Sequence, residues 1–153
     1  MRDTTEYINA EKTALRLIAR AEQCGAGLAR KLEKRGFDPV CVSGVIERLF
    51  ELNLLDDRRY ASAWLRSRLQ FTRSPRRLLS SLCAKGIDSA DAKAAIKETL
   101  NSEAEFSLLT RYAQKTKKKA ACKENGNSAR GMKFILKNEG FSAETIQRFL
   151  DEE

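Results

Sequence analysis

Apolar residues recur along most of the chain at intervals of three and four residues, which is the spacing of one face of an α-helix. After Asp57, for example, Tyr60, Ala61, Trp64 and Leu65 fall on one side of a helix. Few segments show the alternating, β-branched pattern of a strand. The pattern therefore predicts an all-α protein.

The same periodicity predicts nine helices in three consecutive groups of three. The predicted ranges are 5–23, 25–35 and 39–52, then 57–71, 75–85 and 89–100, and then 103–116, 129–139 and 143–151. A helix of about twelve residues is marginal alone, so each group has to bury its apolar faces internally. Three small bundles in a row predict an elongated helical-repeat body. The predicted three-helix units are residues 1–53, 54–101 and 102–153.

One short pattern marks the end of the second helix in every group. It occurs at Leu32–Phe37, Leu82–Ile87 and Leu136–Phe141, each with a glycine before the final apolar residue. The glycines Gly36, Gly86 and Gly140 suit the position just after a helix, where the chain turns left-handed and a Cβ atom would be costly. We therefore predict the same turn three times.

A helix-capping residue follows each of these glycines by two positions. Asp38, Asp88 and Ser142 can accept hydrogen bonds from the free N–H groups that open the next helix. Asn53 is expected to close the third helix of the first group in the left-handed conformation.

Charge is distributed unevenly along this basic chain. The net charge is +8, and residues 56–101 carry ten basic and five acidic groups. Between Arg58 and Ile87 there are eight Arg or Lys residues and no Asp or Glu. A strongly basic protein favours polyanionic partners such as nucleic acid.

Five arginines of this acid-free stretch form the main candidate binding surface. Arg59, Arg66 and Arg73 are seven residues apart, which on one helix keeps them within roughly 40° of each other. Arg76 and Arg77 follow them. A solvated helix face normally mixes charges of both signs, so a polyanionic partner is favoured here. Contact with five phosphates would give log K against log salt a slope of about −3.5 to −4.5.

Other candidates have more than one interpretation. Lys117–Lys119 is either a solubilising run or part of a binding surface, within a segment, 115–127, that is either a frayed helix end or a basic loop. Tyr60 and Trp64 could stack on bases, although their apolar neighbours favour core packing. Arg68 is expected to pair with a carboxylate, for instance that of Asp57.

The residue inventory argues against catalysis and metal binding. Asp56 and Asp57 could form a catalytic carboxylate pair, but their place before a helix favours capping. The chain has no histidine, no nucleophile-and-base pair and no glycine-rich phosphate loop. Its cysteines are Cys24, Cys41, Cys83 and Cys122, with no Cys-x-x-Cys spacing. We expect no enzyme activity, no metal or cofactor, free thiols in a reducing cytoplasm and no membrane segment.

Two other classes of protein are alternatives to a regulator that binds nucleic acid. The turn at Lys85–Asp88 between short helices resembles that of a helix-turn-helix transcription factor, with residues 89–100 as its recognition helix. That helix contains no Asn, Gln or Arg to read bases. A structural adaptor that binds no nucleic acid would show salt-insensitive partner binding.

The sequence also resembles a known family. Leu54–Ala61, Ser74–Leu78 and Leu82–Ile87 together look like the signature of the RecX regulatory family, and the likeness covers most of the chain. Cys24–Gly27 departs from the family pattern, in which Ser and Glu usually open the helix, so a weaker cap is expected. Asn53 replaces a common Gly.

The resemblance implies a non-enzymatic bacterial protein of three tandem three-helix units in a curved body. Such proteins bind the RecA recombinase filament on single-stranded DNA and limit its extension, ATP hydrolysis, strand exchange and the SOS response. Weak binding to single- and double-stranded DNA is implied as well, and we expect a cytoplasmic monomer. The predicted filament and DNA contacts are Arg58, Arg59, Arg66, Arg73, Arg76, Arg77, Lys85, Lys117, Lys118 and Lys119; the predicted structural residues are Gly36, Gly86, Gly140, Asp56, Asp57, Tyr60 and Trp64.

Overall fold

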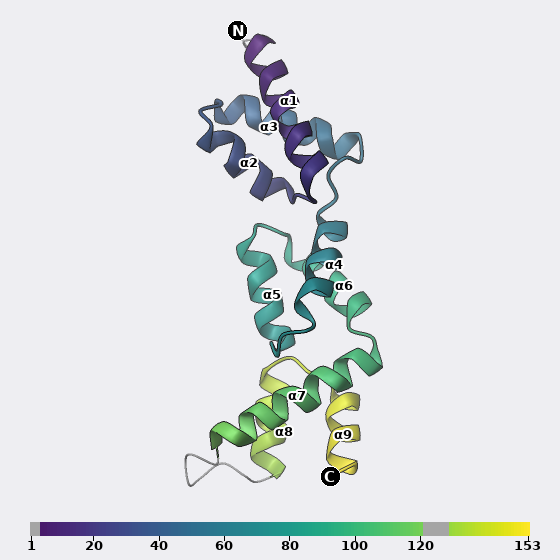
Figure 1. Ribbon diagram of the computed structural model, residues 1–153. Coiled ribbons are helices and arrows are strands. Elements are labelled where there is room, and N and C mark those ends of the chain that lie inside the picture. Colours follow the sequence, from purple (N-terminus) through teal and green to yellow (C-terminus); the bar gives the residue numbers. More distant parts are fainter. Residues whose placement is uncertain (1–3, 121–128) are drawn as a thin grey trace. The chain divides into compact units, whose positions relative to one another are not determined.

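The computed structural model describes residues 4–120 and 129–153, and within these ranges it contains nine α-helices and no strand (Figure 1). The helices are α1 (Thr4–Arg20), α2 (Gly25–Lys34), α3 (Pro39–Glu51), α4 (Asp57–Arg68), α5 (Pro75–Ala84), α6 (Ser89–Thr99), α7 (Ser102–Ala120), α8 (Ala129–Asn138) and α9 (Ala143–Asp151). The all-α prediction is confirmed, and each predicted helix is present.

Three predicted helix ends were wrong. Helix α1 ends at Arg20 instead of residue 23. Helix α4 ends at Arg68 instead of residue 71, and just beyond its end the Arg111 guanidinium from α7 donates to the carbonyls of Leu69 and Gln70 at 2.9 and 3.3 Å. A cation at these last carbonyls stabilises a helix end. Helix α7 continues to Ala120, so Lys117–Lys119 lies in its last turn rather than in a loop. The rest of the segment expected to be either a frayed helix end or a basic loop, residues 121–127, lies outside the described ranges.

The chain divides into two compact units. The first contains Met1–Ala61 and Leu82–Ala92, and the second contains Ser62–Ser81 and Lys93–Glu153. The three helices of the middle group are therefore shared between the units. The three-unit division at residues 1–53, 54–101 and 102–153 stays a prediction of the repeat.

The core of the first unit lies between α1, α2 and α3. Its buried residues are Ala10, Ala14, Leu28, Leu32, Val42, Val45, Leu49 and Leu55. Small alanines on α1 let the larger aliphatic residues of α2 and α3 approach it closely. Burial of one such Leu or Val side chain stabilises the fold by about 1.5–3 kcal/mol.

A second core lies between α7, α8 and α9 in the second unit. Its buried residues are Leu108, Leu109, Ala113, Met132, Leu136, Phe141, Ile146 and Phe149. Glu105 of α7 fixes the start of α9, because its carboxylate accepts hydrogen bonds from the Ser142 amide at 2.7 Å and from the Thr145 hydroxyl at 2.8 Å.

The three repeated turns have the predicted conformation. The φ angles of Gly36, Gly86 and Gly140 are 92°, 88° and 89°, and that of Asn53 is 57°. In each turn the glycine N–H bonds the carbonyl three residues before it, and the next N–H bonds the carbonyl five residues before it. This double bond pattern is the Schellman motif, which satisfies the last carbonyls of the helix.

The capping predictions were right for two of three helices. An Asp88 oxygen accepts the Ala90 N–H at 3.1 Å, and the Ser142 hydroxyl accepts the Thr145 N–H at 3.3 Å. Asp38 was predicted wrongly, since its side chain makes no capping bond to α3. Its own N–H donates to Glu6 of α1 instead, at 2.8 Å.

Candidate nucleic-acid interface

The acid-free stretch begins with a capped helix. The Asp56 carboxylate accepts the N–H groups of Arg58 and Arg59 at 3.0 and 3.1 Å. These are the first free amides of α4, so Asp56 is a capping residue, as predicted. The cap holds Arg58 and Arg59 in the first turn, and both are exposed.

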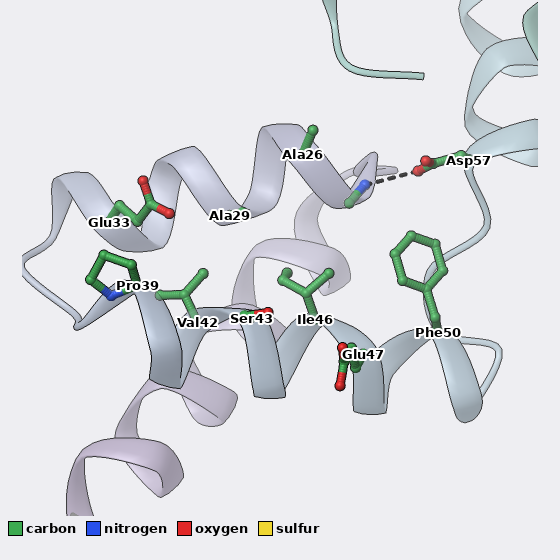
Figure 2. Close-up of a pocket in the computed structure, with 11 residues that line it drawn as sticks. Ala26, Ala29, Glu33, Pro39, Val42, Ser43, Ile46, Glu47, Phe50 and Asp57 are labelled. Atoms are coloured by element: carbon green, nitrogen blue, oxygen red, sulfur yellow. Dashed lines mark hydrogen bonds between the residues drawn. The ribbon is translucent and has the colours of Figure 1, made fainter. Parts of the chain in front are cut away.

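Asp57 caps a different helix from the one it begins. Its carboxylate accepts the N–H of Gly25, the first residue of α2, at 2.8 Å (Figure 2). Cys24 precedes α2 but makes no side-chain capping bond, in agreement with the weaker local cap expected from the sequence. Its thiol lies 3.7 Å from the Lys85 carbonyl, to which it donates. Asp57, 32 residues away in the sequence, therefore provides the N-terminal cap of α2 that Cys24 does not.

Replacement of Asp57 by alanine is expected to lower the free energy of unfolding by about 1 kcal/mol, the usual value of a helix N-cap. Addition of Cys24→Ser should recover much of this loss, because a serine hydroxyl can accept the free amides of α2 locally. Urea unfolding of the single and double variants measures both effects. A loss in Asp57→Ala that Cys24→Ser leaves unchanged would contradict the cap.

Arg59 was expected to be an unpaired cation, and this was wrong. Its Nε atom lies 2.6 Å from an oxygen of Glu22, just after α1. The hydrogen bond that Arg59 donates to Glu22, and then the Glu22 charge, raise the pKa of the Arg59 guanidinium above its ordinary value. Local sequence shows no acid near Arg59, but the fold brings one from 37 residues away. Arg59 is therefore already neutralised.

Arg59, Arg66 and Arg73 were predicted to lie on one helix face, and for Arg73 this was wrong. Since α4 ends at Arg68, Arg73 lies in the connection to α5 and not on the helix. Arg66 and Arg73 are nevertheless both exposed. Neither side chain has an ion-pair partner among the described residues, so both charges face solvent.

Arg68 binds aromatic rings instead of the predicted carboxylate. Its guanidinium carbon lies 5.5 Å from the centre of the Trp64 ring and 5.9 Å from that of Phe71. A cation over an aromatic face is attracted by the electron density of the ring. Trp64 and Tyr60 are half-buried. The Trp64 ring thus already has a cationic neighbour.

Helix α5 begins at Pro75, and Arg76 and Arg77 follow in its first turn, where both are exposed. The buried Ser74 accepts the Arg77 N–H at 3.4 Å and donates to the Glu139 carboxylate. The Arg76 N–H donates to the Glu139 carbonyl at 3.0 Å. The end of α8 therefore fixes the start of α5 through backbone and Ser74, leaving both guanidinium groups without an ion-pair partner among the described residues.

The pKa of Tyr112 in α7 depends on the charges around the start of α5. Burial raises its pKa above the ordinary value, and the Glu139 charge adds to this effect. Arg77 and Arg76 act in the opposite direction and lower the same pKa. The two arginines and Glu139 are therefore close enough to influence one phenol.

A cavity of about 350 Å³ extends the basic surface beyond the predicted residues. Its charged lining is Arg76 with Lys93 and Lys97 of α6, and its lining includes no carboxylate. The two lysines were not among the predicted contacts, because Asp91 and Glu98 lie near them in the sequence. Their spacing of four residues on one helix was the available signal.

The remaining predicted cations, the four lysines, differ in exposure and in pairing. Lys117 pairs with Glu153 and lies 5.6 Å from the centre of the Phe149 ring, so it is engaged within the second unit. Lys118 and Lys119 are exposed in the last turn of α7, and Lys85 is half-buried.

Residues 4–120 and 129–153 contain neither a metal site nor a membrane-spanning helix. No group of three His, Cys, Asp or Glu side chains there is placed to hold a metal ion. No helix in the same part of the chain is both long and apolar enough to cross a bilayer. Cys24 and Cys83 are free thiols, while Cys122 lies outside the described residues.

Comparisons with known proteins agree on one family. Residues 56–96 match the family model described as RecX, second three-helix domain. The regulatory protein RecX of Treponema pallidum (strain Nichols) is 33% identical over 142 residues, which cover 92% of this chain and 83% of that protein. The regulatory protein RecX of Halorhodospira halophila is 33% identical over 135 residues, covering 88% and 81%.

Solved structures share the fold. A crystal structure of RecX from Lactobacillus salivarius superposes with a TM-score of 0.74 over 97% of this chain and 96% of that chain, at 21% identity. A crystal structure of regulatory protein RecX gives a TM-score of 0.75 over 95% and 72%, at 20% identity.

Proposed function

This chain belongs to the RecX family of regulatory proteins, and we propose that it is a non-enzymatic negative regulator that binds the RecA recombinase filament on DNA. Binding in the filament groove or at its growing end limits filament extension. The filament then hydrolyses less ATP, exchanges strands more slowly and induces the SOS response less.

One observation carries the electrostatic part of this proposal. Arg66, Arg73, Arg76 and Arg77 are exposed, and none has an ion-pair partner in the described part of the chain. Unpaired like charges repel one another, and the phosphates of a nucleoprotein filament would relieve that repulsion. Because Arg59 is paired, only these four arginines are counted as phosphate contacts. The slope of log K for DNA binding against log salt would then be about −2.8 to −3.6.

The proposal extends to partners and compartment. Single-stranded DNA is the preferred nucleic acid because it lies within the filament, and double-stranded DNA is bound through the same phosphates without sequence preference. The protein acts as a cytoplasmic monomer. Several modest contacts between one monomer and the filament add up to the binding affinity.

Filament ATPase provides the direct test. Addition of the protein to RecA filaments preformed on single-stranded DNA is expected to inhibit ATP hydrolysis near stoichiometric amounts. Electron microscopy of the same mixtures should show shorter filaments. Full ATPase activity at equimolar protein would refute the regulatory role.

A helix-turn-helix transcription factor is the competing function. Its recognition helix would be α6, whose charged side chains Lys93 and Lys97 suit phosphates better than base edges. Footprinting on genomic fragments is expected to show no protected operator. A defined footprint at moderate salt would favour the transcription factor.

A further inference from the structure

A groove with the opposite charge lies in the first unit, between α2 and α3. Its volume is about 390 Å³. Figure 2 shows Pro39, Val42, Ile46 and Phe50 along α3, on the side that faces α2. None of these residues belongs to the predicted filament or DNA contacts.

The groove exists because α3 has a second apolar stripe. One stripe, Val45 and Leu49, is buried in the core, and Val42 belongs both to that core and to the groove lining. The other runs from Pro39 to Phe50, about 16 Å or three helical turns. The α2 residues that line it include Ala26 and Ala29, which are too small to cover it.

Phe50 is held at one end of the groove by the start of α2. A Cβ atom at Gly25 would lie 2.6 Å from the Phe50 ring, so the glycine makes room for it. The ring is still 37% exposed. The groove therefore ends in a partly exposed aromatic side chain, which is typical of protein-binding anchors.

The charges of the groove exclude nucleic acid. Glu33 and Glu47 line it, and no Lys or Arg does, in a chain whose net charge is +8. Both carboxylates are exposed, and neither has an ion-pair partner among the described residues. Two unpaired carboxylates repel a phosphate backbone and attract Lys or Arg side chains beside an apolar anchor.

We propose that this α2–α3 groove binds an amphipathic helix of a protein partner, with aliphatic anchors against Ile46 and Phe50 and Lys or Arg beside Glu33 and Glu47. An apolar strip of about three turns is the form of helix-in-groove recognition. This proposal rests on the proposed function, and the partner helix is then part of a recombinase subunit in the filament. The second unit's arginines then bind DNA while this groove binds protein.

The test uses charge reversal on the full chain. Glu33→Lys with Glu47→Lys is expected to raise the protein concentration that halves filament ATPase by about tenfold, because two opposite-charge contacts become repulsive. Its affinity for single-stranded DNA without recombinase should not fall. The matched control, Glu51→Lys with Glu144→Lys, adds the same charge at exposed positions outside the groove and should inhibit like the unmodified protein.

Photo-crosslinking gives a second readout. A benzophenone amino acid at Ser43, an exposed residue of the groove, is expected to crosslink to the recombinase subunit, whereas one at Ala19 of α1 should not. If the unmodified protein fails to inhibit filaments, the proposed function fails. If it inhibits but the groove reversal inhibits equally well, or Ser43 crosslinks only to DNA, the groove inference alone is overturned.

Discussion

Replacement of Arg66, Arg73 and Arg77 together by glutamine is expected to weaken binding to single-stranded DNA about 100-fold at 0.1 M salt. Each phosphate contact on a single strand releases about 0.7 counterions, worth roughly 1 kcal/mol at this salt concentration. Three lost contacts total about 3 kcal/mol, which is the 100-fold change. The three side chains are exposed, so the fold should be unaffected.

Fluorescence anisotropy over a range of salt concentrations measures this effect. The slope of log K against log salt should become shallower by about 2 for the triple variant. Inhibition of the recombinase filament should weaken in parallel. A triple variant with the unmodified slope would show that these arginines do not contact phosphates.

Arg59→Gln is the matched control for Arg66→Gln. Both residues are exposed arginines on α4, seven residues apart, and the substitution is the same. Arg59 is paired with Glu22, so a phosphate has to displace that carboxylate before it can bind. The single Arg66 variant should therefore lose more DNA affinity than the single Arg59 variant. Equal losses would mean that the ion pair does not restrain Arg59.

Gly86→Ala is expected to destabilise the protein more than Gly36→Ala does, although both glycines close the same turn. At Gly36 the added Cβ meets no atom within 4 Å, so the cost is that of the left-handed conformation, about 1–2 kcal/mol. At Gly86 the Cβ would lie 2.4 Å from that of Ala26. This clash brings the total to about 2–5 kcal/mol.

Thermal unfolding followed by circular dichroism measures the difference. Each kcal/mol corresponds to about 2–4 °C for a chain of this size. Ala26→Gly removes the clashing methyl group, so it should relieve part of the Gly86→Ala loss when compared with Ala26→Gly alone. Similar midpoints for the two glycine variants would contradict the close approach of the turn at Gly86 to α2.

Local signals in the sequence were sufficient for the helices and their turns. Gly36, Gly86 and Gly140 mark positive-φ positions because a Cβ atom is costly there whatever surrounds it. The cap at Asp56 was equally predictable, since a carboxylate beside free amides acts within three residues. These features depend on neighbours in the chain alone.

The candidate site depends on residues that are distant in sequence, and there prediction failed in specific places. Glu22 neutralises Arg59 across 37 residues. Arg111 of α7 donates to the Leu69 carbonyl just beyond the end of α4, from 42 residues away. Asp57 caps α2 in place of pairing with Arg68. In each case the sequence contained both partners but gave no signal that they meet.

The sequence by itself determined an all-α chain with three repeats of one turn, together with the excess of basic residues in its middle third. Helical periodicity, left-handed glycines and net charge are local or additive properties, so they can be predicted without knowledge of the fold. Only the tertiary structure decided which arginines remain unpaired and which apolar stripe of α3 stays uncovered. Ion pairs and grooves arise between segments far apart in sequence, and their geometry exists only once those segments have packed.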